Sequence, residues 1–260
     1  MSDLVSEGSN ALLKKDAEPK VTAAAWMQRA LDEGASPDLA DDSGFTALML
    51  ALARRDYGLF KVLMKAGADV NLKDAHGATA LMYAAYYSGD PDVISALLNA
   101  GADVNAQDEN GLTALMNAAI RDMGHEAIVR LLKAGADTSA RSSNGWTALM
   151  WLVVCSRFLG LNPVLFYAMV DGGSDVNARD NDGATPLMLA AASNFKPWGV
   201  GLLLREGADI NAKDNRGKNV LAYARLNANT DVFFALKRKL GSDEPLGIDL
   251  SFWDWRDDLL

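Results

Sequence analysis

One unit of the chain shows most clearly the pattern that decides the fold: Asp74-Ala-His-Gly-Ala-Thr-Ala-Leu-Met-Tyr-Ala-Ala-Tyr-Tyr, followed by Asp92-Val-Ile-Ser-Ala-Leu-Leu-Asn-Ala-Gly-Ala-Asp-Val-Asn. Asp74 and Gly77 predict a tight turn, because aspartate accepts hydrogen bonds from the backbone amides ahead of it and glycine adopts positive φ. Thr79 is placed to cap a first short helix. A second short helix ends at Gly101, which is a typical left-handed C-cap.

The same unit recurs along the chain. Its turn glycines are Gly44, Gly77, Gly111, Gly145, Gly183 and Gly217, at spacings of 33, 34, 34, 38 and 34 residues. The closing glycines are Gly34, Gly67, Gly101, Gly135, Gly173, Gly207 and Gly241. A unit of this length cannot bury its own apolar face, so neighbouring units must stack around one continuous core. We therefore predict an all-α repeat solenoid whose function lies on a surface.

The unit resembles the ankyrin repeat, whose Gly-x-Thr-Pro-Leu-His start and Gly-Ala-Asp-Val-Asn finish match over roughly residues 20–241. The resemblance implies paired antiparallel helices with β-hairpin-like turns, capped at both ends. One departure is systematic: the family's histidine is replaced by Met49, Met82, Met116, Met150 and Met188. We expect apolar packing at these positions in place of a histidine–threonine hydrogen bond.

The repeat pattern predicts eight segments. They are an N-terminal helical cap (1–40), five repeats (41–73, 74–107, 108–141, 142–179 and 180–213), a C-terminal capping repeat (214–241) and an acidic aromatic tail (242–260). The fourth repeat carries an insertion of four residues, which we expect between its helices, because insertions in solenoids go to loops.

Composition narrows the classes of function. The chain has 25 basic and 34 acidic residues, a formal net charge of -9, so nonspecific attraction to nucleic acid is unfavourable. Cys155 is the single cysteine, and residues 1–20 lack the apolar run of a signal peptide, so we expect a cytoplasmic protein. No apolar stretch is long enough to span a membrane.

The sequence predicts no catalytic site, metal or cofactor. A hydrolase needs a nucleophile beside a base, and outside its carboxylates the chain offers only His76, His125 and Cys155. Each of the three has a structural interpretation, at a turn tip, in an outer helix and in an inner helix. No zinc-ligand spacing, phosphate-binding loop or dinucleotide fingerprint occurs.

The resemblance implies that a partner binds the concave face, which consists of the turn tips and the exposed ends of the inner helices. The residues predicted to bind it are Phe45, Arg54, His76, Tyr86, Tyr87, Leu112, Ile120, Arg121 and Trp146. Aromatic residues and arginine dominate the energetics of protein interfaces. The alternative is that Phe45, Leu112 and Trp146 only pack between neighbouring turns.

The tail places apolar residues on one face of a predicted helix. Ile248, Phe252, Trp255 and Leu259 are spaced four, three and four residues apart. Two interpretations remain open: the tail covers the apolar end of the last repeat, or it is a linear motif that inserts Trp253 or Trp255 into another protein.

These features favour a monomeric, non-enzymatic adaptor, scaffold or inhibitor that binds another protein. A second interpretation is a bacterial effector or toxin-neutralising, immunity-like protein whose acidic surface masks a basic partner. A third, an enzyme on an ankyrin scaffold, would need a second domain for which no residues remain.

Overall fold

The structure, a computed structural model, describes residues 22–121, 125–156, 162–193, 197–226 and 230–241. Its helices are α2 (Ala23–Asp32), α3 (Ala47–Arg54), α4 (Tyr57–Lys65), α5 (Ala80–Tyr83), the π-helix η1 (Ala84–Ser88), α6 (Pro91–Asn99), α7 (Ala114–Arg121), α8 (His125–Lys133), α9 (Ala148–Cys155), α10 (Pro163–Asp171), α11 (Pro186–Ala192), α12 (Pro197–Arg205), α13 (Val220–Leu226) and α14 (Thr230–Gly241). Extended pairing within this part of the chain is limited to three isolated antiparallel bridges in the turns.

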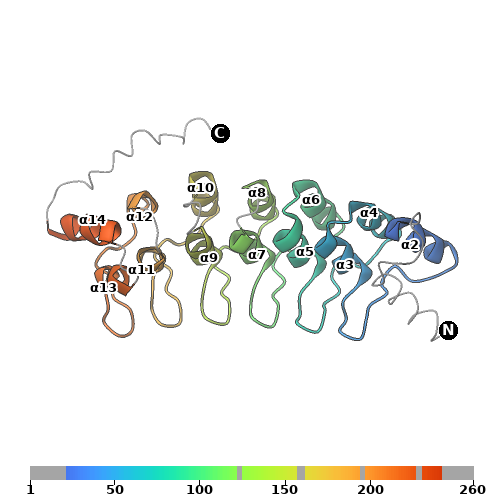
Figure 1. Cartoon of the computed structure of the whole chain (residues 1–260), viewed down its shortest axis with the longest axis horizontal. Coiled ribbons are helices and arrows are strands. Elements are labelled where there is room, and N and C mark those ends of the chain that lie inside the picture. The colour runs from blue at the N-terminus through green and yellow to red at the C-terminus, as the bar shows by residue number, and fades with distance from the viewer. Residues whose placement is uncertain (1–21, 122–124, 157–161, 194–196, 227–229, 242–260) are drawn as a thin grey trace.

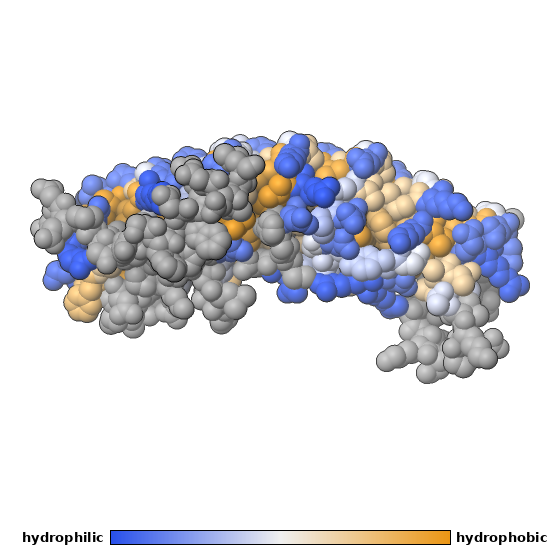
Figure 2. Space-filling view, turned by 90° about the horizontal axis from the view of Figure 1, so that it is seen from above, coloured by the Kyte–Doolittle hydropathy of each residue, from blue (hydrophilic) through white to orange (hydrophobic). Residues whose placement is uncertain are grey.

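The helices form two rows, and long turns project from one side (Figure 1). The inner row contains α3, α5, α7, α9, α11 and α13, and the outer row contains α4, α6, α8, α10, α12 and α14. Each row makes contacts from one unit to the next, and α2 packs against α4 at the N-terminal end. Seen from above, the stack is bowed along its length (Figure 2). The predicted all-α repeat solenoid is confirmed.

The core runs continuously between the two rows. One leucine from each of the first five inner helices is at most 1% exposed, and these residues are Leu48, Leu81, Leu115, Leu149 and Leu187. The methionine that follows each of them is also buried, as predicted. Because each leucine touches its own unit and the next, removal of apolar surface from water stabilises the stack as a whole.

Threonine caps the start of most inner helices, as the sequence predicted. The hydroxyl oxygens of Thr46, Thr113, Thr147 and Thr185 accept a hydrogen bond from the amide three residues ahead, at 3.2–3.4 Å. Thr79 is the exception: it occupies the N-cap position of α5, but its buried hydroxyl has no hydrogen-bond partner. The prediction of a capping bond at Thr79 was therefore wrong.

The turn aspartates act as predicted. In each, Oδ1 accepts hydrogen bonds from the amides two and four residues ahead, at 2.7–3.0 Å, at Asp41, Asp74, Asp108, Asp180 and Asp214. Ser142 replaces aspartate in the fourth turn, where its hydroxyl accepts from the amide of Trp146. The glycine three residues after each of these positions has a positive φ.

Successive turns are joined by backbone hydrogen bonds into a ribbon along one edge of the solenoid. The amides of Ala75, Glu109, Ser143, Asn181 and Asn215 each donate to a carbonyl of the preceding turn, at 2.7–3.2 Å. The asparagine of the Asp-Val-Asn finish adds a second link: Asn71 donates to the carbonyl of Gly101 and accepts from the amide of Asp103. Asn105 and Asn177 repeat this pair of bonds in later units.

Irregularity is confined to the connection between inner and outer helices. From each closing glycine to the next turn glycine the chain always has ten residues, whereas Gly77 to Gly101 is one residue longer than Gly44 to Gly67. In the second unit the last turn of the inner helix widens to π-helical geometry in η1, which ends at Gly89 with φ 61°. The longer insertion of the fourth unit lies between α9 and α10, and residues 157–161 are outside the described residues.

Because some turn glycines contact the next turn and others do not, replacing them with alanine should lower the free energy of unfolding by different amounts. A Cβ on Gly111 would lie 2.9 Å from the carbonyl oxygen of Arg141 and 3.0 Å from Cα of Ser142, whereas one on Gly217 meets nothing within 4 Å. Both glycines have φ above 70°, so alanine costs about 1–2 kcal/mol at either position. We expect Gly111→Ala to cost about 1–3 kcal/mol more than Gly217→Ala in urea unfolding.

An internal control separates this clash from position along the stack. Gly101→Ala shares the positive φ but also meets open space, and it lies in the unit preceding Gly111. Equal destabilisation by Gly111→Ala and Gly101→Ala would contradict the contact between turns.

Two serine hydroxyls lower the pKa of a neighbouring aspartate. The Ser43 hydroxyl donates to Asp41 at 2.6 Å and is the main cause that holds the pKa of Asp41 below its ordinary value; Ser139 does the same for Asp137. A lowered pKa in the folded state adds stability above about pH 4, which is lost as pH falls through the folded pKa. We expect Ser43→Ala to raise the pKa of Asp41 alone, and Ser139→Ala that of Asp137 alone. Carboxyl carbon NMR titrations measure both, and an unchanged pKa in either variant would contradict the assignment.

Candidate protein-binding surface

Four aromatic rings and one guanidinium form a continuous series across three neighbouring units. The ring of Phe45 meets Tyr83 edge-on at 5.2 Å, Tyr83 stacks on Tyr87 at 6.0 Å, and Tyr87 meets Tyr86 edge-on at 4.8 Å. The guanidinium carbon of Arg121 lies 5.1 Å from the centre of the Tyr86 ring. Distances and orientations of this kind are favourable for aromatic and cation–π pairs. We call these five residues the aromatic ladder.

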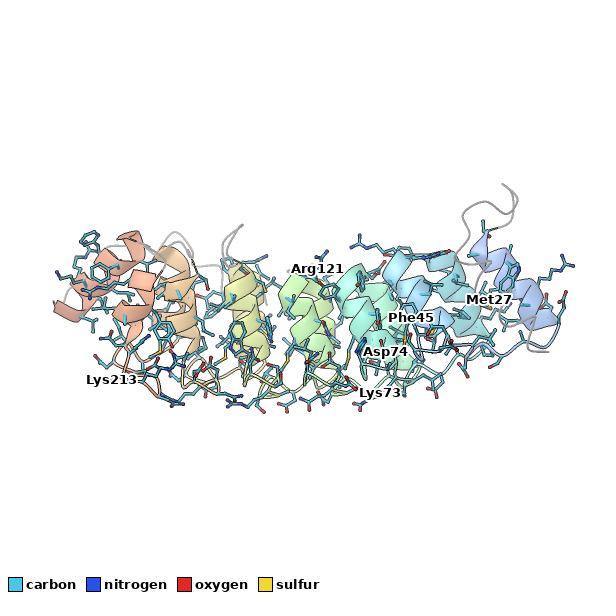
Figure 3. All side chains as sticks on the ribbon, turned by 60° about the horizontal axis from the view of Figure 1, so that its bottom comes forward. Met27, Phe45, Lys73, Asp74, Arg121 and Lys213 are labelled. Carbon is cyan, nitrogen blue, oxygen red and sulfur yellow. The ribbon has the colours of Figure 1, made fainter. Side chains whose placement is uncertain are left out.

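The ladder runs from the turns toward the opposite end of the inner helices. In Figure 3, Phe45 and Asp74 lie between Lys73 on the turn edge and Arg121 at the other end of the helices. Phe45 precedes α3, Tyr86 and Tyr87 belong to η1, and Arg121 ends α7. The structure therefore brings together four of the nine residues that the sequence predicted to bind a partner.

Tyr83 is the member of the ladder that the sequence analysis missed. It occupies the sixth position after the turn glycine, where the other units carry Leu50, Asn117, Trp151, Leu189 and Tyr223. Three large aromatic residues in one structural position were a signal that the sequence contained. Partner-binding residues were expected only at the first position after the glycine and at the end of the inner helix.

A hydrogen bond to the turn carboxylate fixes Tyr83. Its hydroxyl donates to Oδ2 of Asp74 at 2.7 Å, while Oδ1 of Asp74 accepts the two turn amides. Burial, and then the neighbouring carboxylate, raise the pKa of Tyr83 above its ordinary value, so the phenol remains a neutral donor at physiological pH. The bond thus ties the orientation of the central ring of the ladder to the geometry of the turn.

Side chains of the first unit contact η1, which carries Tyr86 and Tyr87 of the ladder. The side chain of Arg55 donates from Nε to the carbonyl oxygen of Tyr87, and the hydroxyls of Tyr57 and Ser88 are 3.2 Å apart. Arg55 itself adopts a left-handed conformation with φ 56°, which is uncommon for a residue with a side chain. Two contacts from the first unit therefore restrain η1, and Tyr87 still exposes 39% of its surface.

Trp146 belongs to a second cluster, in the fourth unit. Its ring lies 4.6 Å from that of Trp151, and its indole N–H donates to Oδ2 of Asp180 at 3.1 Å. Asp180 is the aspartate of the following turn, so this side chain links two units. The indole N–H of Trp151 is buried without a hydrogen-bond partner.

The remaining predicted residues of this surface lie at a turn tip, directly after a turn glycine or near the ends of the inner helices. Arg54 is exposed at the end of α3, and His76 is exposed at a turn tip with Nδ1 4.0 Å from a carboxylate oxygen of Glu109. Leu112 and Ile120 are half-buried, and Leu112 packs against the core. The predicted tail residues Ile248, Phe252, Trp253, Trp255 and Leu259 lie outside the described residues.

The turn edge adds exposed carboxylates beside the ladder. Asp41 and Asp42 are exposed in the first turn, and Glu109 is exposed in the third. The basic residues of the turns instead lie along the ribbon: Lys73 donates to the carbonyl of Gln107, and Arg179 to that of Lys213. The surface therefore combines aromatic rings and an arginine with a negatively charged margin.

Neither a metal site nor a membrane-spanning helix occurs in the part of the chain that the structure describes. It contains no group of three or more His, Cys, Asp or Glu side chains suited to hold a metal ion. Nor does any helix among the described residues have the length and apolar character needed to cross a membrane.

Comparison with known proteins identifies the repeat. Residues 20–108, 81–162 and 152–244 each match the family described as "Ankyrin repeats (3 copies)". An ankyrin repeat-containing protein of Schizosaccharomyces pombe is 39% identical over 51 residues, which are 20% of this chain and 25% of that protein. One of Treponema pallidum is 41% identical over 61 residues, 24% of this chain and 20% of that protein. The chain thus matches a quarter or less of the length of these curated relatives.

A solved structure shows the same architecture over most of the chain. The matched chain belongs to the complex of the predatory endopeptidase Bd0816 from Bdellovibrio bacteriovorus with immunity protein Bd3460. Its TM-score is 0.66 and its sequence identity to this chain is 27%. The match covers 74% of this chain and 97% of that chain. With the family matches spanning most of its length, this chain belongs to the ankyrin-repeat family, whose repeats act in protein–protein interaction.

Proposed function

We propose that the protein is a non-enzymatic binding module of the cytoplasm that holds a partner protein against the aromatic ladder, as an adaptor, scaffold or inhibitor. The contact series Phe45–Tyr83–Tyr87–Tyr86–Arg121 carries this proposal. Tyrosine and arginine are enriched among the residues that contribute most to binding energy. In this chain they are gathered from three units onto one face.

The ladder is suited to binding because it is already ordered. Asp74 orients Tyr83, and Arg55 and Tyr57 restrain η1. Immobilising a flexible side chain on binding costs about 0.5–1.5 kcal/mol, so rings held in place beforehand retain more of their contact energy. The partner would contribute an apolar or cationic group that covers the exposed part of Tyr87.

A second candidate function is neutralisation of an enzyme, in the manner of an immunity protein. The solved complex of an endopeptidase with its immunity protein contains a chain that this protein matches over 97% of that chain's length. The net charge of -9 and the exposed carboxylates of the turn tips favour a basic partner. In this case the ladder would cover a surface near the partner's active site.

Substitutions in the ladder test the main proposal. We expect Tyr87→Ala and Arg121→Ala each to weaken binding of the captured partner by about 30-fold or more, the range of interface hot spots, since both remove exposed contact groups. Affinity capture with wild-type bait identifies the partner, and calorimetry then measures its Kd with each variant. Phe234→Ala is the matched control, because it removes an exposed aromatic ring from α14, far from the ladder. Unchanged Kd in both ladder variants, with circular dichroism unchanged, would contradict the proposal.

Salt and enzyme activity test the second candidate. If carboxylates steer a basic enzyme, its association rate should fall by about tenfold or more between about 50 and 500 mM NaCl. The captured partner should also lose hydrolytic activity when saturated with this protein. A partner without hydrolytic activity, or one whose activity persists at saturation, would exclude neutralisation while leaving the ladder proposal intact.

A further inference from the structure

The last described helix of the solenoid, α14, exposes apolar side chains. Phe234 is 63% exposed and Leu240 is 38% exposed, and both belong to α14. The outer helix before it, α12, packs against α14, and α14 is the last helix in the described part of the chain. An exposed apolar surface that is bordered by polar residues is a candidate docking site.

Basic side chains surround this surface. Lys237 and Arg238 follow Phe234 by three and four residues, so the three share one face of α14. Phe233 meets Phe234 edge-on at 5.7 Å and carries the Arg225 guanidinium at 5.0 Å from its ring centre. Residues 214–241 contain six basic and two acidic residues, a net charge of +4 in a chain whose net charge is -9.

The sequence that follows has the complementary character. Residues 242–260 contain six acidic residues and one arginine, a net charge of -5. Ile248, Phe252, Trp255 and Leu259 would share one face if residues 248–260 were helical, and Asp249 and Asp258 would flank that face, one on each side. Apolar and charged patterns of the segment therefore match those of the exposed face of α14.

The connection is long enough for the segment to turn back. Six residues, 242–247, separate Gly241 from Ile248 and span up to about 20 Å when extended. Phe234 lies seven residues before Gly241, about 10 Å along the helix axis. A helix of 13 residues is about 20 Å long, comparable to the roughly 18 Å of the 12-residue α14.

We propose that residues 248–260 dock on the exposed face of α14, with Phe252 and Trp255 covering Phe234 and the aspartates facing Lys237 and Arg238. The segment then closes the open end of the stack in place of another repeat. Docking also supplies the order that an isolated helix of this length lacks, particularly one with Asp257 and Asp258 near its C-terminal end. This inference is independent of the ladder, which lies in the first three units.

Hydrogen exchange of the full-length chain, followed by mass spectrometry, tests the docking. We expect Trp255→Ala to raise amide exchange in α14 by about tenfold or more, because an apolar contact that slows opening is removed. Trp253→Ala is the matched control: it removes the same ring from the opposite side of the predicted helix and should leave α14 unchanged. Phe234→Ala should in turn raise exchange in residues 248–260, and because this side chain is largely exposed, the variant should fold normally.

Three results would overturn the docking. The first is exchange of residues 248–260 in the wild-type protein at the rate of an unstructured peptide. The second is protection that depends on protein concentration, which would assign the face to a second copy of the chain. The third is protection that appears only when the captured partner is added, which would make the segment a linear motif for another protein.

Discussion

In five of the six turns, one carboxylate sets the geometry on which the rest of the solenoid depends. Its Oδ1 accepts two backbone amides and closes the turn, so the next amides can pair with the neighbouring turn. Its Oδ2 remains available, and aromatic donors use it three times: Tyr83 at Asp74, Trp146 at Asp180 and Tyr223 at Asp214. Burial followed by this bond raises the pKa of Tyr223 to about 12. The same group thus builds the scaffold and orients side chains of the inner face.

This arrangement separates what is constant from what varies. The spacing of ten residues from a closing glycine to the next turn glycine never changes, because an added residue would break the ribbon of hydrogen bonds between turns. Length differences fall instead toward the connection between the paired helices, and Tyr86 and Tyr87 of the ladder belong to the π-helix η1 at this end of an inner helix. Single-turn π-helices are frequent at functional sites, since they redirect side chains without ending a helix. Variation and the candidate binding surface therefore coincide.

The sequence predicted the scaffold well, because turn aspartates, positive-φ glycines and capping threonines act within a few residues of one another. It predicted the aromatic ladder only in part. Phe45, Tyr86, Tyr87 and Arg121 were named as candidates, but their mutual contacts depend on how far each unit rotates against the next, which no local pattern reports. Tyr83 was missed because its role depends on Asp74, nine residues away across the turn. The missing hydrogen bond of the Thr79 hydroxyl could not be predicted, because the sequence around Thr79 resembles that around the threonines that form the bond.

We propose that a partner binds the aromatic ladder and not the outer helices. The most direct measurement is a crystal structure of the protein with the partner that it captures. We expect the interface to bury Tyr86, Tyr87 and Arg121. We also expect Tyr83 to keep its hydrogen bond to Asp74. An interface formed by α6, α8 and α10, with the ladder left open to solvent, would contradict it.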